Sequence, residues 1–162
     1  MRKKGLLLLL TMLCLLQGGC SIVGDDDEVG ERVVVGDRVP EFAVSVVADG
    51  ATTTFSTAHL TGETVIVFFH TSCSDCQREL PELNAYYLQH RDEPGFQMVA
   101  ISRGEGAETV APFWAEHGLQ IPYSAQTDRS IYDLFASSII PRVYFVSAQG
   151  IITKILVENF DL

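Results

Sequence analysis

The sequence predicts a single α/β domain whose central sheet is mostly parallel and has an antiparallel edge. Residues 64–69 form a continuous apolar run ahead of a break, which is typical of a strand buried on both faces. Further β-rich runs alternate with helix-like segments, and the last two flank a tight turn at residues 148–150. No repeat or second linker interrupts residues 33–162, so we expect one domain there.

The predicted elements follow one another as a hairpin and then βαβαβαββ. The β-rich runs at residues 42–47 and 52–55 surround Asp49-Gly50, which is a strong hairpin signal. A helix over residues 74–89 and a strand over residues 96–102 follow the apolar run. The remaining expected elements are a helix at 107–117, a short strand at 121–126, a helix from Asp128 to about Ala136, and strands at 142–147 and 151–157.

The composition supports a packed core and excludes a nucleic-acid partner. Of 162 residues, 47% are hydrophobic and 20% are charged, which is too apolar for a disordered chain. The formal net charge is -10, and Lys and Arg do not cluster after residue 4. Binding nucleic acid requires a basic face, so we expect no such partner.

The first 19 residues are typical of an export signal. Three cations at residues 2–4 precede the apolar run 6–16, which is too short for a membrane-spanning helix of about 20 residues. A small residue directly before Cys20 is similar to a bacterial lipobox, in which the cysteine receives a diacylglycerol, although Gln17 stands where lipoboxes usually carry Leu. We expect an exported chain anchored by lipid at Cys20, with a plain secreted or uncleaved chain as the alternative.

Residues 20–32 are expected to be a lipidated N-terminus and an acidic linker. The run Asp25 to Glu28 is like-charged and punctuated by glycine, so it should stay extended as a tether. An acidic run just after a lipidated cysteine also resembles the surface-export signal of some Gram-negative lipoproteins. The predicted location is therefore the periplasm, at the inner or outer membrane, with the cell surface as the alternative.

Cys73 and Cys76 are the two cysteines left for chemistry, because Cys14 lies in the signal and Cys20 is the expected lipid site. They stand at the start of the helix that follows the apolar strand. Unpaired backbone N–H groups and the helix dipole favour an anion there, so Cys73 should ionise readily and attack a disulfide. Cys76, one turn on, can then attack the mixed disulfide that Cys73 forms.

A static disulfide and a metal site are the alternatives for this pair. A disulfide that closes so short a loop removes little chain entropy and would be a poor staple. His70 precedes Cys73 by three residues, but tetrahedral zinc needs a fourth ligand, and the chain has neither a second CxxC motif nor a paired-His spacing. Redox chemistry is therefore favoured, and we expect no metal and no cofactor.

Several motifs in order resemble the thioredoxin-like, membrane-anchored thiol–disulfide oxidoreductases of the TlpA/ResA type, within the redoxin (AhpC/TSA-like) superfamily. The motifs are Gly36-Asp37-x-x-Pro40-x-Phe42, Cys73-x-x-Cys76 after the apolar strand, Glu79-Leu80-Pro81, and Ile140-Pro141 ahead of Val143-Tyr144-Phe145-Val146 and Gly150. The resemblance covers residues 33–162 and implies a three-layer α/β/α sandwich around a mixed sheet, with an N-terminal hairpin. The helix and strand between residues 107 and 126 are similar to the insert of this type.

The resemblance also implies roles for individual residues. Pro141 matches the family's cis-proline, which lies against the cysteine pair, and Ile140 would offer its backbone to an extended substrate segment. Pro81 should kink the helix, because it removes a backbone hydrogen bond. Glu79 matches a frequent family acid, with a solvent-facing helix charge as the alternative.

Departures from the family pattern bear on the site. Ser72 replaces the usual Trp, which should leave the pair more exposed, and Val67 replaces the buried carboxylate of thioredoxin. A proton acceptor for Cys76 must then come from elsewhere; His70 is the nearby candidate, and an exposed loop histidine is the alternative. Asp75 should oppose the ionisation that the helix dipole favours, because like charges repel.

Only residues 158–162 follow the last predicted strand, where the family normally adds a helix over one sheet face. With apparently no C-terminal helix, we expect either a partner or second copy that covers this face, or a shorter and less stable domain.

The predicted function is disulfide exchange with exported, cysteine-containing proteins. A reducing role in an oxidising compartment needs an electron donor, which implies a membrane thiol reductase. A peroxiredoxin-like thiol peroxidase is one alternative, but its nucleophile normally follows Thr by three residues, and Thr71 precedes Cys73 by two. A non-enzymatic copper chaperone is another, although its cysteines are normally separated by three residues.

Overall fold

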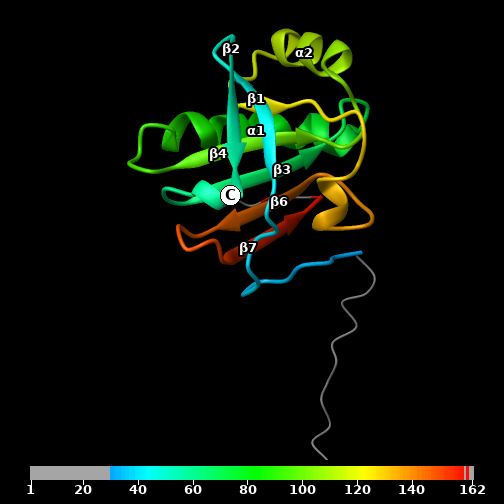
Figure 1. Ribbon diagram of the computed structural model, residues 1–162. Coiled ribbons are helices and arrows are strands. Elements are labelled where there is room, and N and C mark those ends of the chain that lie inside the picture. The colour runs from blue at the N-terminus through cyan, green and yellow to red at the C-terminus, as the bar shows by residue number, and fades with distance from the viewer. Residues whose placement is uncertain (1–29, 159, 161–162) are drawn as a thin grey trace, which may run out of the picture.

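The computed structural model describes residues 30–158 and residue 160. The expected export signal, the lipid site at Cys20 and most of the acidic linker lie outside the described residues. A seven-stranded mixed sheet forms the centre, in the order β2-β1-β5-β4-β3-β6-β7 (Figure 1). The elements are β1 (Ala43–Ala48), β2 (Ala51–Ser56), the 3-10 helix η2 (Thr57–His59), β3 (Thr64–Phe69), α1 (Ser74–His90), β4 (Gln97–Ser102), α2 (Ala107–Glu116), β5 (Tyr123–Ser124), the 3-10 helix η3 (Tyr132–Leu134), β6 (Arg142–Val146) and β7 (Ile152–Val157).

The strand directions confirm a mixed α/β sheet with antiparallel edges. The prediction that the sheet is mostly parallel is wrong, because only two of the six neighbouring strand pairs in the described region are parallel. β3, β4 and β5 are parallel neighbours, whereas β6 runs antiparallel to β3 and β7 antiparallel to β6. At the other edge β1 and β2 form the predicted hairpin. Asp49 and Gly50 close it with φ of 50° and 76°, as a two-residue hairpin turn requires.

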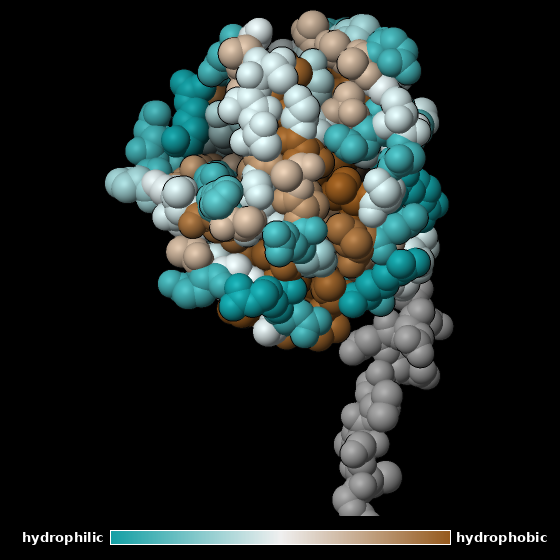
Figure 2. Space-filling view, in the orientation of Figure 1, coloured by the Kyte–Doolittle hydropathy of each residue, from teal (hydrophilic) through white to brown (hydrophobic). Residues whose placement is uncertain are grey.

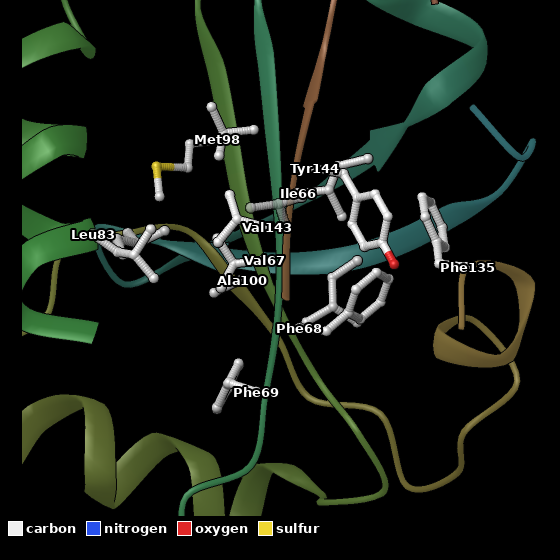
Figure 3. Close-up of a cluster of buried hydrophobic side chains, with 14 of the residues drawn as sticks. Ile66, Val67, Phe68, Phe69, Leu83, Met98, Ala100, Phe135, Val143 and Tyr144 are labelled. Atoms are coloured by element: carbon white, nitrogen blue, oxygen red, sulfur yellow. The ribbon is translucent and has the colours of Figure 1, made fainter. Parts of the chain in front are cut away.

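β3 is the centre of the core, and all six of its side chains are buried. Successive strand residues point to opposite faces, so β3 packs against both layers. Figure 3 shows Phe69 on the side of Leu83 and Phe68 on the side of Phe135. Phe69 packs against Trp114 of α2 with ring centroids 4.9 Å apart, and Phe68 packs against Phe135 at 5.0 Å. The prediction of a doubly buried strand is confirmed.

α1 and α2 lie on the same face of the sheet. The crossovers β3-α1-β4 and β4-α2-β5 both step in one direction through the sheet, and right-handed crossovers then place both helices on one side. The opposite face is covered by η3 and by the N-terminal segment of residues 30–42, where Phe42 packs edge-on against Phe135. The second outer layer therefore consists of loop and 3-10 structure, and it is thinner than the helical layer.

The helix expected from Asp128 to Ala136 is absent, and this prediction is wrong. Asp128 accepts a hydrogen bond from the Ser130 backbone at 2.8 Å, which stabilises a local turn instead. The Phe135 carbonyl accepts from the Arg32 backbone at 2.8 Å, so a distant segment takes up this backbone group. Only η3 remains helical.

Polar residues surround an apolar centre on the face seen in Figure 2. Over residues 30–158 and 160, the large apolar side chains that are exposed are Val34, Val35, Leu88 and Leu134. None of them belongs to β6 or β7, the last two strands of the chain. Phe160, after β7, packs partly buried against the core.

Candidate active site

The two cysteines lie where the chain leaves the carboxyl end of β3 and enters α1. Both are free thiols, and Cys73 is the N-cap residue of the helix. The Cys73 Sγ accepts a hydrogen bond from the Cys76 backbone N–H at 3.3 Å. Cys73 is half-buried, whereas Cys76 is 0% exposed. The Cys73 sulfur can therefore react with a substrate disulfide, whereas the Cys76 sulfur can react only with Cys73.

The environment of Cys76 favours the neutral thiol. Burial raises the pKa of Cys76 far above its usual range, and the hydrogen bond with the Cys73 side chain raises it further. A backbone hydrogen bond from His70 and the charge of Arg103 lower the pKa without offsetting the burial. Cys76 therefore needs a proton acceptor before it can act as a nucleophile.

The loop before β6 forms the other side of the site. The Ile140–Pro141 peptide bond is cis, and the Cys73 thiol donates to the Ile140 carbonyl at 3.7 Å. This proximity follows from the sheet, because β6 pairs with β3 and Arg142 lies opposite Phe68. Residues just before β6 must then lie beside residues just after β3. The resemblance placed Ile140 and Pro141 at this position, and their roles in substrate binding stay predictions.

An open groove of about 380 Å³ lies over Cys73. Its lining residues are His70, Ser72, Cys73, Arg103, Ile139, Ile140 and Glu158. A hollow of similar size, about 390 Å³, lies between the β1–β2 turn and α2, away from both cysteines. Of these two hollows, only the groove over Cys73 is lined by a cysteine.

His70 contacts groups other than the Cys76 thiol with its ring. The His70 Nδ1 atom lies 2.9 Å from the Ser72 hydroxyl and 3.4 Å from Glu105 Oε1. The buried Glu105 carboxylate also accepts from the Thr71 N–H and hydroxyl, each at 2.6 Å. The expected role of His70 as proton acceptor for Cys76 stays a prediction, because the contact between these residues is through the His70 backbone.

Arg78 neutralises the two acidic residues near the start of α1. It lies 2.7 Å from Asp75 Oδ1 and 3.0 Å from Glu79 Oε1. The Arg78 and Asp75 side chains are 53% and 39% exposed, so this pair contributes little to stability, but it offsets the repulsion expected between Asp75 and Cys73. The side chain of Glu79 is only 8% exposed, which shows that it is not a solvent-facing helix charge.

Arg103, Glu105, Ile139 and Glu158 were not predicted as site residues. Arg103 and Glu105 directly follow β4, the parallel neighbour of β3. Because the carboxyl ends of parallel strands meet at one edge, their position was a usable signal. Glu158 follows β7 and reaches the groove only through the β6–β7 pairing.

Two further findings apply to the part of the chain that the structure describes. It contains no group of three or more His, Cys, Asp or Glu side chains that could hold a metal ion. It also contains no helix that is long and apolar enough to cross a membrane.

Comparisons with known proteins agree with this geometry. The chain is similar to the thiol-disulfide oxidoreductase ResA of Bacillus subtilis (strain 168), with 27% identity over 150 residues, 92% of this chain and 80% of that protein. It is also similar to ResA of Geobacillus thermodenitrificans (strain NG80-2), with 26% identity over 157 residues, 96% of this chain and 85% of that one.

Solved structures with the same fold confirm the thioredoxin-like sandwich. A putative protein disulfide isomerase from Bacteroides thetaiotaomicron has a TM-score of 0.74 at 24% identity, covering 82% of this chain and 84% of that one. A putative thioredoxin from Neisseria meningitidis has a TM-score of 0.63 at 25% identity, covering 74% and 78%. The model of the AhpC/TSA family matches residues 35–155. Because this match spans well over half of the sequence, the chain belongs to the AhpC/TSA family.

Proposed function

We propose that this protein exchanges disulfides with exported, cysteine-containing proteins through Cys73 and Cys76. The chain is a thiol–disulfide oxidoreductase of the AhpC/TSA family, and the similar proteins from Bacillus subtilis and Geobacillus thermodenitrificans are both named thiol-disulfide oxidoreductases. The observation that carries the proposal is the pairing of a groove-facing thiol with a buried one at the N-terminus of α1.

The chemistry proceeds in two balanced steps when a substrate disulfide is reduced. The Cys73 thiolate attacks one substrate sulfur, a mixed disulfide forms, and the other substrate sulfur leaves as a thiolate that takes up a proton. Cys76 then loses its proton and attacks the Cys73 Sγ, which forms the Cys73–Cys76 disulfide and releases the second substrate sulfur. Two electrons pass to the substrate, and the reverse sequence oxidises it.

Repeated reduction requires an electron donor. Each turnover leaves a disulfide that needs two electrons and two protons to return to the dithiol. In an oxidising compartment outside the cytoplasm, a membrane thiol reductase is the donor that this chemistry calls for.

The proposal includes export and a lipid anchor at Cys20, in the periplasm or at the cell surface. Residues 1–19 would be removed, and residues 20–32 would connect the lipid to the domain of residues 33–162. Metabolic labelling with a fatty acid tests the anchor: label on the wild type and none on Cys20→Ser is expected. An unlabelled wild type contradicts the anchor, and protease shaving of intact cells distinguishes the cell surface from the periplasm.

One set of assays tests the activity. Insulin-disulfide reduction and peroxide consumption are measured for the wild type, Cys73→Ser and Cys76→Ser, with metal content determined on the same preparations. We expect the wild type to reduce insulin and both variants to lose turnover. A wild type that neither reduces nor oxidises disulfides contradicts the proposal, and peroxide consumption or bound copper would support the peroxidase or the chaperone.

The contacts of Thr71 favour the oxidoreductase over the peroxidase. A peroxidatic threonine must face the nucleophilic sulfur, but the Thr71 hydroxyl donates to Glu105 Oε1 at 2.6 Å. It is therefore engaged with a carboxylate and not with Cys73.

A partner or second copy over the sheet face is also part of the proposal. The exposed large apolar side chains of the described region lie outside β6 and β7, so the proposal does not depend on an apolar contact at these two strands. Size-exclusion chromatography with light scattering tests it: a well-folded monomer that binds no hydrophobic dye contradicts the need for a partner.

A further inference from the structure

Arg142 carries a charge in the interior of the molecule. It follows Pro141 directly, as the first residue of β6, and it is 0% exposed. The guanidinium stays charged at every physiological pH and must therefore be compensated. Its Nη1 group forms an ion pair with the Glu31 carboxylate, whose other oxygen accepts from the Tyr144 hydroxyl at 2.9 Å.

The same guanidinium holds the turn that precedes Pro141. Its Nε donates to the carbonyls of Ser138 and Ile139, both at 3.0 Å, and its Nη2 donates to Ser138 at 2.8 Å. The Tyr132 hydroxyl donates to the Ile139 carbonyl at 2.8 Å. Ile139 has a φ of 64°, which a β-branched residue adopts only when its surroundings enforce it. Arg142 and Tyr132 supply that enforcement.

This turn is the groove wall nearest the reactive sulfur. Ile139 and Ile140 line the groove, and the Ile140 carbonyl accepts from the Cys73 thiol. Arg142 does not line the groove, so any effect on substrate passes through the backbone that it holds.

Glu31 reaches Arg142 from the opposite end of the chain. Ser137 N–H donates to the Gly30 carbonyl at 2.7 Å, and Glu31 forms a β-bridge with Ala136. These contacts fix the segment that begins at Gly30 against the back of the Ser138–Ile140 turn. The end of the linker segment, at Gly30 and Glu31, therefore packs behind the turn that lines the groove.

We propose that Glu31 and Arg142 are positioning residues for disulfide exchange, because their ion pair holds the Ser138–Ile140 turn where it presents the Ile140 backbone to a protein substrate. The inference rests on the proposed function. Binding of a protein substrate depends on the Ser138–Ile140 turn, whereas a small disulfide needs only to reach Cys73 and does not require this turn.

The test uses the full chain and two substrates. Steady-state kinetics are measured with insulin and with bis(2-hydroxyethyl) disulfide for the wild type, Glu31→Gln and Arg142→Lys. The matched control is Glu41→Gln, which removes the same charge from an exposed position in the same N-terminal segment. We expect the KM for insulin to rise on the order of tenfold in the two variants, because a displaced binding wall loses orientation. The small disulfide and the control should change less than about twofold.

Hydrogen exchange gives a readout that is independent of turnover. The amide protons of residues 137–140 should exchange faster in Glu31→Gln and Arg142→Lys than in the wild type, while those of β3 and β4 remain protected. Unchanged exchange at residues 137–140 in both variants contradicts the inference.

A second variant separates positioning from general stability. Removing one partner of a buried ion pair destabilises a protein, whereas replacing both by apolar residues restores much of the stability. The double variant Glu31→Leu/Arg142→Met should therefore regain the unfolding midpoint but keep the raised KM for insulin, because the donors to Ser138 and Ile139 are still missing. If a single variant does not fold, the KM of the double variant for insulin still tests the proposal.

The outcomes distinguish the two proposals. Equal losses on both substrates, wild-type KM for insulin in both single variants, or recovery of that KM in the double variant overturns the positioning role alone. A wild type that is inactive on both disulfides overturns the proposed function together with the inference.

Discussion

Cys73 and Cys76 are three residues apart but lie in different environments. Cys73 faces an open groove, and Cys76 is fully buried. The local motif predicts which cysteine attacks first, because the first position of CxxC lies at the exposed helix N-terminus. The degree to which Cys76 is buried could not be predicted, because it depends on the packing of segments that are distant in the sequence, such as the loop at Ile140 that contacts Cys73.

The first prediction concerns alkylation of the native chain. With iodoacetamide at pH 7.5, we expect modification of Cys73 and little of Cys76, because Cys76 is buried and its pKa is raised. Peptide mass mapping measures the two sites separately. In guanidinium chloride both should react, and equal labelling of the two cysteines in the native chain would contradict the assignment.

The second prediction concerns stability at alkaline pH. A raised pKa means that the folded chain holds the Cys76 proton more tightly than the unfolded chain does. The contribution of Cys76 to the free energy of unfolding is therefore complete below the ordinary cysteine pKa of about 8.5, and it declines as the pH rises above that value. Between pH 8 and 9.5 the free energy of unfolding of the reduced wild type should fall by about 1 kcal/mol, and that of Cys76→Ser should not show this fall.

Urea unfolding under reducing conditions measures this difference. The measurement ends before pH 10, because burial also raises the pKa of Tyr86 and Tyr144. Above about pH 10, the ordinary tyrosine pKa, these two residues would also lower the free energy of unfolding. Parallel curves for the wild type and Cys76→Ser would show that the thiol does not titrate as described.

Glu105 is the subject of the third prediction. Its buried carboxylate accepts hydrogen bonds from the Thr71 N–H and hydroxyl, and removing the carboxylate leaves these buried donors unsatisfied at a cost of about 1–3 kcal/mol. Glu105→Ala should be destabilised by that amount in urea unfolding, and Glu116→Ala, on the exposed surface of α2, should not. Equal stabilities would mean that the Thr71 contacts contribute nothing.

At the scale of elements, α1 follows the sequence pattern closely. Its apolar residues Leu80 and Leu83 are buried against the sheet, and the predicted helix end at residue 89 differs from the observed end by one residue. The period of 3.6 residues makes such a face readable from the sequence. The segment at 128–136 was not readable, because its course depends on a local turn at Asp128 and on contacts of Phe135 with the distant Arg32.

The fourth prediction uses the two faces of α1. Leu83→Ala should destabilise the chain by about 2–5 kcal/mol, because Leu83 is 0% exposed and its removal leaves a cavity beneath the sheet. Leu88→Ala on the same helix is the control, since Leu88 is 37% exposed. Chemical denaturation measures both, and equal losses would mean that α1 does not bury this face.

At the scale of the whole molecule, the N-terminal segment closes the fold. Residues 30–42 cross the sheet face that α1 and α2 leave open, and they bring Val33 and Phe42 into the core. Gly30 and Glu31 contact the loop before β6, so both residues are part of the folded domain. The proposed tether therefore joins the domain beside the groove.

The fifth prediction separates the anchor from the chemistry. Cys20→Ser should move the protein from the membrane fraction to the soluble fraction, because one acyl-bearing cysteine is the proposed attachment. The kcat for insulin should stay within about twofold of the wild type, because the cysteine pair is held by the folded domain alone. Retention of Cys20→Ser in the membrane fraction would point to another attachment.

The sequence alone determined the buried strand, the hairpin, the helix with its N-terminal cysteine pair and the family. The first three depend on neighbours within a few residues, where side-chain period, turn residues and helix ends leave a local pattern, and the family depends on the order of several such local motifs along the chain. Only the tertiary structure decided that Glu31 pairs with Arg142, that Glu105 binds Thr71, and that Ile140 lies at Cys73. These contacts join segments that are 34 to 111 residues apart, and their pairing depends on strand order and chain crossovers, which no local pattern encodes.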